Sequence, residues 1–80
     1  MILRQLISLT YGAEKYSPNG WISVPDGEAR YMEAHIRHML GHAQGITYDS
    51  ATGFSHLSHA AWNLLAVMEL QLRKEENESV

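Results

Sequence analysis

The chain has 80 residues, with six basic and nine acidic side chains, a formal net charge of −3 and no cysteine. This length predicts one small domain, and the charge balance excludes a protein that binds a nucleic acid polymer through its phosphates. The lack of cysteine excludes disulfides and thiolate metal sites. No apolar run is long enough to cross a bilayer, and the first residues lack a signal-peptide pattern, so we expect a cytoplasmic protein without a membrane partner.

A chain of this size buries only about 60% of its unfolded surface, which leaves a marginal core for a monomer. Self-association is the usual remedy where disulfides are absent, so we expect a homo-oligomer.

The first predicted element is a helix over residues 3–16, where apolar residues recur at helical spacing. The run Ser17-Pro18-Asn19-Gly20 carries strong turn chemistry and should end it. Residues 21–25 are expected to be extended or irregular, because the residue before Pro25 avoids the α region.

A second helix is predicted to follow Asp26, which is a good N-cap residue. It should end near residue 44, with Gly45 as its C-cap. Its apolar face would consist of Met32, Ile36, Met39, Leu40 and Ala43. Residues 46–53 are rich in turn formers and are expected to form a loop.

The third predicted helix starts at Phe54 or Ser55 and runs to about Lys74. Apolar residues cover much of its circumference, which fits burial against a partner subunit as well as against the chain's own core. The acidic residues 75–80 are expected to be a frayed tail. The predicted fold is therefore all-α, a compact three-helix domain over residues 1–74 that is completed by homo-oligomerisation.

All five histidines lie between His35 and His59, in the second and third predicted helices. Residues three, four or seven apart share a helical face. One helix therefore carries a stripe of His35, His38 and His42, and the other carries a stripe of His56, His59 and Asn63. Buried imidazoles need partners or ligands, so this pattern indicates a site between the two helices.

Each stripe has a functional and a structural interpretation. His56, His59 and Asn63 are spaced to bind a metal or an anionic ligand, and imidazole suits zinc, copper, iron or nickel. Alternatively, these side chains form hydrogen bonds to loop carbonyls. In the other stripe, the pair of Arg37 and His38 suits a phosphate group, whereas His35 or His42 could simply be solvent-exposed.

Carboxylates decide which metal chemistry is available, since magnesium prefers oxygen ligands. Glu33 lies four residues before Arg37, so it is either a metal ligand or half of a helical ion pair. Asp49 precedes the third predicted helix and is either a ligand near His56 or an Asx turn.

Three residues around the first turn are candidate substrate contacts. Lys15 could bind a phosphate, and Tyr16 and Trp21 could stack on a base. The alternative for Trp21 is that it fills the gap between helices.

In combination, these elements resemble a small phage domain family, the dATP/dGTP diphosphohydrolase N-terminal domain, over residues 9–72. The matching elements are Thr10-Tyr11-Gly12-Ala13-Glu14-Lys15-Tyr16, Asn19-Gly20-Trp21, Val24-Pro25-Asp26, Arg30-Tyr31, Arg37-His38, Asp49, Gly53, His56-Leu57-Ser58-His59-Ala60 and Asn63. Each element alone is weak, and their order and spacing together are specific.

The resemblance implies a phage or prophage origin, a MazG-like all-α fold, and cleavage of purine deoxynucleoside triphosphates to monophosphate and pyrophosphate. We expect Asp49, His38 and His56 to be catalytic. A divalent metal (Mg²⁺, Mn²⁺, Co²⁺ or Zn²⁺) would be held by His56, His59, Asp49 and Glu33. The expected substrate contacts are Lys15, Tyr16, Trp21, Arg37 and Asn63.

Two alternatives belong to other functional classes. Many relatives carry acids in the loop where this chain has Thr47 and Ala51, and MazG-like enzymes use paired glutamates that are absent from these predicted helices. These departures favour a protein that binds or sequesters a nucleotide without cutting it, acting in host takeover or anti-defence. The other alternative is a helical oligomer that binds a host protein and uses its histidines structurally.

Overall fold

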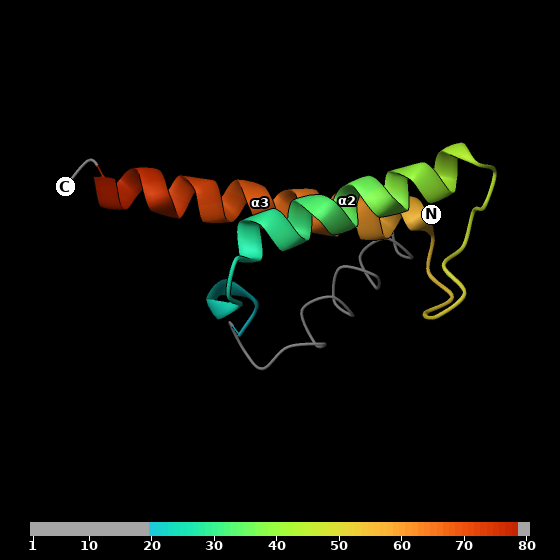
Figure 1. The fold of residues 1–80 in the computed structure, drawn as a ribbon, viewed down its shortest axis with the longest axis horizontal. Helices are drawn as coiled ribbons and strands as arrows, with labels where there is room; N and C mark the ends of the chain where they lie inside the picture. Colours follow the sequence, from blue (N-terminus) through green and yellow to red (C-terminus); the bar gives the residue numbers. More distant parts are fainter. Residues whose placement is uncertain (1–19, 79–80) are drawn as a thin grey trace.

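A computed structural model describes residues 20–78 of the chain. This part contains a short 3-10 helix η1 (Gly20–Ser23) and two α-helices, α2 (Gly27–Ala43) and α3 (His56–Glu78). α2 and α3 lie side by side and run in opposite directions, joined at one end by the loop of residues 44–55 (Figure 1). The all-helical class is thus confirmed for these residues. The first predicted helix, over residues 3–16, lies outside the described residues, so the expected total of three helices is not tested.

α2 begins directly after Asp26, as predicted, but the Asp26 side chain does not cap the helix. Asp26 occupies the N-cap position with φ 55° and ψ 32°, and its side chain makes no capping hydrogen bond. Instead, the chain enters the helix through a tight turn in which the Gly27 amide donates to the Val24 carbonyl. The predicted Asp26 side-chain cap is therefore wrong.

The C-terminus of α2 agrees with the sequence prediction. Gly45 follows the C-cap residue with φ 86°, and its amide donates to the His42 carbonyl. Glycine adopts this left-handed conformation without the steric penalty that a Cβ would bring. The glycine therefore turns the chain away from α2 and into the loop.

Residues 20–23 form η1, so the expectation of an extended or irregular segment over residues 21–25 is wrong for residues 21–23, whereas residues 24 and 25 are irregular as expected. The restriction imposed by Pro25 acts only on Val24, which leaves the preceding residues free to form a helical turn. This turn carries Trp21 onto Tyr31 and Trp62, with ring centroids 6.4 Å and 6.1 Å away. The Tyr31 hydroxyl also donates to the Trp21 carbonyl at 2.7 Å, which ties η1 to α2.

The core of the described region lies at the N-terminal half of α2 and the middle of α3. It consists of buried Tyr31, Ala66 and Val67, with partly buried Trp21, Val24, Met32, Trp62 and Leu70 packed against it. Ile36, Met39 and Leu40 of the predicted apolar face are exposed. The face that was predicted for α2 therefore contributes only Met32 to this cluster.

α3 begins at His56, one residue later than the later predicted start at Ser55. The Ser55 hydroxyl accepts a hydrogen bond from the Ser58 amide, as expected for a residue just before a helix. The helix continues beyond the predicted end at Lys74 to Glu78, so residues 75–78 of the expected tail are helical. Neither α2 nor α3 is long and apolar enough to span a membrane.

Candidate metal and nucleotide site

A polar cavity of about 810 Å³ opens between α2, the loop of residues 44–55 and α3. We call it the polar cavity. The acidic, basic and imidazole side chains that line it are Arg30, Glu33, Arg37, His38, Asp49 and His59. Two guanidinium groups and two imidazoles at one cavity make it suited to a phosphorylated ligand.

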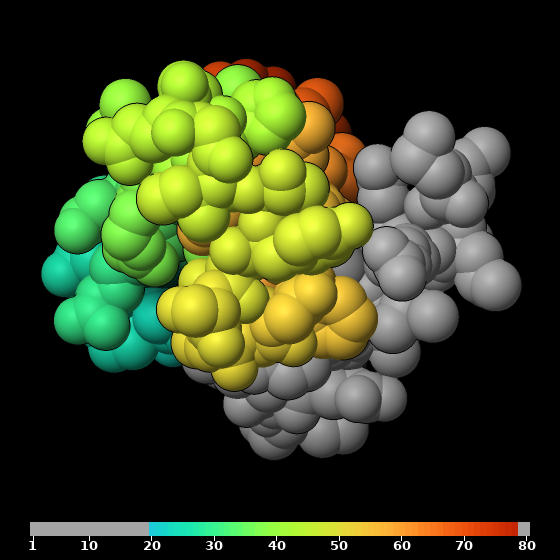
Figure 2. Space-filling view, turned by 90° about the vertical axis from the view of Figure 1, so that its right-hand side faces the viewer, coloured from blue at the N-terminus to red at the C-terminus, as the bar shows by residue number. Residues whose placement is uncertain are grey.

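The loop is folded back on itself, and this fold positions Asp49. Tyr48 and Ser55 form an isolated antiparallel bridge, and the Asp49 amide donates to the Phe54 carbonyl at 2.8 Å. At the tip, Gly53 has φ 77° and its amide donates to the Asp49 carbonyl. Figure 2 shows this loop lying across the end of the helix pair. Asp49 is thereby presented to the helices.

Two histidines from different helices are joined directly. Nδ1 of His38 on α2 lies 2.8 Å from Nδ1 of His56 on α3, and the His38 ring stacks on the His59 ring at 4.7 Å. One of the two Nδ1 atoms must donate and the other must accept, so they share one proton between them. His35, by contrast, donates from Nδ1 to the Ala60 carbonyl at 2.8 Å.

The environment of His38 keeps its ring neutral. Burial, together with the nearby charges of His59, His56 and Arg37, lowers the pKa of His38 from 6.5 to about 4, against an opposing effect of Asp49. A neutral imidazole is the form that binds metals. His38 is therefore in its ligating form at neutral pH.

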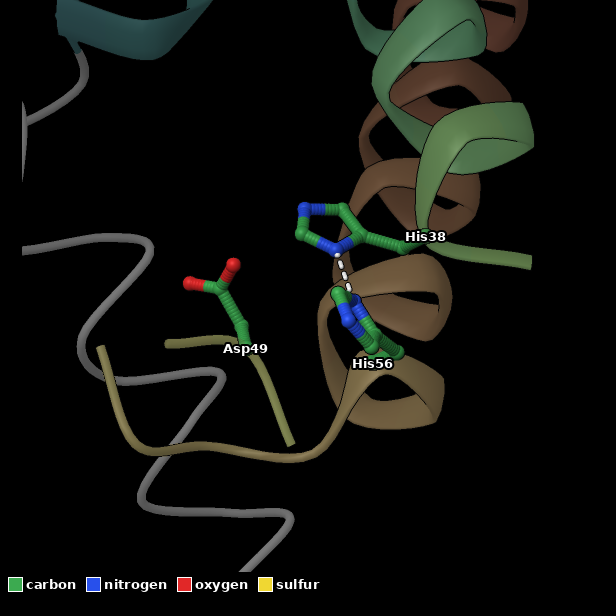
Figure 3. Close-up of side chains that lie close together, drawn as sticks. All are labelled: His38, Asp49 and His56. Carbon is green, nitrogen blue, oxygen red and sulfur yellow. Dashed lines mark hydrogen bonds between the residues drawn. The ribbon is translucent and has the colours of Figure 1, made fainter. Parts of the chain in front are cut away.

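Asp49 completes a cluster with the two histidines. One ligand atom from each of His38, Asp49 and His56 lies within 4.8 Å of the others, and Figure 3 shows Asp49 on the loop beside the two histidines. We call these three residues the His–Asp–His cluster. Burial alone would raise the pKa of Asp49, but hydrogen bonds from Thr52 and the nearby His59 and His38 lower it below its ordinary value.

The other predicted ligands lie beside this cluster. Nε2 of His59 is 2.7 Å from the Thr52 hydroxyl and 3.9 Å from Asp49 Oδ2, so His59 is bonded to the loop. Glu33 lines the polar cavity from an exposed position on α2. The structure therefore brings Asp49 and His56 together with His38, whereas His59 and Glu33 are near the cluster but not in it.

Arg37 lies where a ligand can reach it. Between residues 20 and 78, the ion pairs are Glu69–Arg73 and Asp49–His59, so the expected helical pair of Glu33 and Arg37 is not formed. Arg37 lines the polar cavity together with Arg30, which was not among the site residues predicted from the sequence. The spacing of seven residues between the two arginines is the signal that could have found Arg30.

The remaining predicted contacts divide into three groups. Asn63 is buried, lines the polar cavity and donates from Nδ2 to the His59 carbonyl at 2.8 Å. Trp21 packs between the helices, as in the structural interpretation, and it is Trp62 that lines the polar cavity. Lys15 and Tyr16 lie outside the described residues.

The family described as dATP/dGTP diphosphohydrolase, N-terminal, matches residues 3–80. The searches against curated proteins and against solved structures gave no match.

Proposed function

We propose that this chain, which belongs to the dATP/dGTP diphosphohydrolase N-terminal domain family, hydrolyses dATP or dGTP to the monophosphate and pyrophosphate. The observation that carries the proposal is the polar cavity, where the arginines of α2 lie together with His38 and Asp49 of the His–Asp–His cluster. Phosphate binding and activation of water are thus available side by side.

The arginines would hold the phosphate chain. Arg30 and Arg37 are seven residues apart on one helix, which places them about 10 Å apart along its axis. Both are exposed at the polar cavity, and neither is paired with a carboxylate in the described part of the chain. Guanidinium groups bind phosphate oxygens in a bidentate manner. Lys15 and Tyr16 remain proposed as further substrate contacts.

An aromatic side chain at the polar cavity could stack on the base of the nucleotide. Trp62 lines the polar cavity and is held by edge-on contact with Tyr31, with ring centroids 5.5 Å apart. Stacking of a base on an aromatic ring tolerates several bases, so Asn63 beside it is the better candidate for selecting purines.

The His–Asp–His cluster would hold a divalent metal. When bound, the metal would lower the pKa of water and offset phosphate charge. Water would attack the α-phosphorus and release its proton to the solvent, and pyrophosphate would leave with the electrons of the broken P–O bond. Arg30 and Arg37 would stabilise the negative charge that develops on the leaving group.

The proposal is tested by incubating the protein with each of the four deoxynucleoside triphosphates and with Mg²⁺, Mn²⁺, Co²⁺ or Zn²⁺ in turn. Ion-exchange chromatography then separates the products. We expect monophosphate and pyrophosphate from the purines only. His56→Ala and Arg37→Ala should abolish turnover with the fold intact, whereas His42→Ala, an exposed position on α2, should not. Unaltered rates in both of the first two variants would contradict the proposal.

A second candidate function is nucleotide binding without hydrolysis. Ala51 lines the polar cavity beside Asp49, so an uncharged residue stands where many relatives are expected to carry an acid. A sequestering protein would raise its melting temperature with nucleotide and return that nucleotide intact.

We also propose that the protein is a homo-oligomer. Leu57, Leu64, Met68 and Leu72 are between 38% and 52% exposed and recur at helical spacing along α3. Such a stripe is typical of an interface between helices. Light scattering coupled to size-exclusion chromatography tests this, and a monomer mass would contradict it.

A further inference from the structure

We propose that the His–Asp–His cluster is a transition-metal site with an open coordination position, in which the metal replaces the proton shared by His38 Nδ1 and His56 Nδ1. The inference names the cofactor of the proposed reaction. The role of the metal in hydrolysis rests on the proposed function, whereas the binding of the metal does not.

The His56 ring can present only one of its nitrogens to a metal. A Cβ added to Gly41 would lie 2.9 Å from Nε2 of His56 and 3.0–3.1 Å from the two carbons beside that nitrogen. The Nε2 edge therefore packs on the α2 backbone at Gly41, while Nδ1 faces His38. Gly41 is a positioning residue, because any side chain there would push the ring away.

Asp49 is also oriented by its neighbours. The Thr52 amide and hydroxyl both donate to Oδ2 of Asp49, at 3.1 Å and 2.9 Å. Two donors on one oxygen fix the carboxylate and leave Oδ1 as the oxygen for the metal. Hydrogen bonds of this kind hold metal-binding carboxylates in most protein sites.

His59 supports this arrangement as a positioning residue. The Thr52 hydroxyl donates its only proton to Asp49. Its oxygen must therefore accept the hydrogen bonds from the Phe54 amide at 3.3 Å and from His59 Nε2 at 2.7 Å. His59 is therefore protonated on Nε2. The chain of hydrogen bonds from His59 through Thr52 to Asp49 gives this histidine a role without placing it on the metal.

The donor set determines which metal fits. Two imidazoles and one carboxylate match first-row transition metals, whereas magnesium favours oxygen ligands. Three protein ligands leave a position for water or substrate, as in catalytic zinc sites. Tetrahedral coordination at roughly 2.0–2.1 Å would require the two nitrogens to separate to about 3.3 Å. The present 2.8 Å is thus close to a metal-bound arrangement.

The test is a titration of the tag-free full chain, stripped with a chelator, with Co²⁺ as the probe and without nucleotide. We expect one equivalent of Co²⁺ per chain, with visible absorption of low-coordinate cobalt. Zn²⁺ should abolish this absorption and excess Mg²⁺ should not. Absence of Co²⁺ uptake, or displacement of Co²⁺ by Mg²⁺, would overturn the inference.

Variants locate the site. His38→Ala, His56→Ala and Asp49→Asn should each abolish uptake. Thr52→Val and Gly41→Ala should weaken it by roughly 10- to 100-fold. His35→Ala and His42→Ala remove histidines from the same helix outside the cluster and should leave uptake unchanged. Equal losses in the cluster variants and in these controls would contradict the assignment.

The outcomes also separate this inference from the proposed function. Stoichiometric Co²⁺ uptake without turnover of any nucleotide would support the metal site and remove the proposed reaction. Turnover supported by Mg²⁺ without Co²⁺ uptake would support the reaction and overturn the transition-metal site.

Discussion

Nδ1 of His38 and Nδ1 of His56 lie 2.8 Å apart and join α2 to α3 through a single shared proton. The contact lies away from the aromatic core, in the part of the helix pair that the loop covers. The contact connects His38, which lines the polar cavity, to α3, and it makes the stability of the helix pair sensitive to protonation.

The metal-free protein should lose stability as the pH falls from about 7 to about 4. The pKa of His38 is 6.5 in the unfolded chain and about 4 in the folded protein, so the unfolded chain binds more protons between these values. The free energy of unfolding therefore decreases across this window, and the contribution of His38 levels off below it. Urea unfolding in the presence of a chelator measures the effect.

The control for this pH dependence is His38→Asn, which removes the titrating ring. Its free energy of unfolding should change less steeply over the same window than that of the wild type. Equal slopes in the two proteins would contradict the assignment to His38.

Gly41→Ala should reveal the close approach of His56 to α2. Alanine is favoured over glycine in a helix by about 1 kcal/mol, so the change alone would stabilise α2. In the wild type, the contact of the new Cβ with His56 should cancel or reverse this gain. In a His56→Ala background, the full gain should appear. A double-mutant cycle by urea unfolding checks this, and equal effects in both backgrounds would exclude the contact.

Tyr31→Phe should destabilise the fold without changing metal uptake. The variant loses the hydrogen bond to the Trp21 carbonyl and keeps the ring in the core. A hydrogen bond of this kind contributes about 1 kcal/mol, which corresponds to roughly 4–8 °C in the Tm of a domain of this size. Thermal unfolding measures the loss, and an unchanged Tm would show that η1 is not anchored through this bond.

Arg30→Ala should weaken nucleotide binding by roughly 10- to 100-fold, since charge-assisted hydrogen bonds contribute about 1.5–3 kcal/mol. Isothermal titration with a purine deoxynucleotide measures the change in Kd. Arg73→Ala is the matched control, because Arg73 pairs with Glu69 at 2.8 Å and does not line the polar cavity. Equal affinities in the two variants would remove Arg30 from the site.

Helical periodicity and end signals were enough to predict α2 and most of α3 from the sequence. Gly45 ends α2 as expected, because its chemistry is local. The error at residues 21–23 is also local, because the backbone restriction that Pro25 imposes on Val24 was extended to the residues before it. The exposed Ile36 and Leu40 could not be assigned from periodicity, because an apolar face gives no information about what packs on it.

The sequence predicted the residues of the candidate site whose positions depend on local structure, but not those whose contacts depend on how the loop and the helices pack. The helical stripes identified His38 and His56, and the turn pattern identified Asp49. Spacing could not decide that His59 bonds to Thr52, because that contact depends on how the loop folds back. Gly41 was missed because its importance arises only where α2 and α3 approach each other.

The most direct test of the central claim is a ³¹P NMR spectrum of dGTP after incubation with the protein and the metal it takes up. The account predicts that the triphosphate resonances are replaced by those of deoxyguanosine monophosphate and pyrophosphate in equal amounts, and that Arg37→Ala leaves the dGTP intact. Unreacted dGTP with the wild type, or release of orthophosphate or tripolyphosphate in place of pyrophosphate, would contradict it.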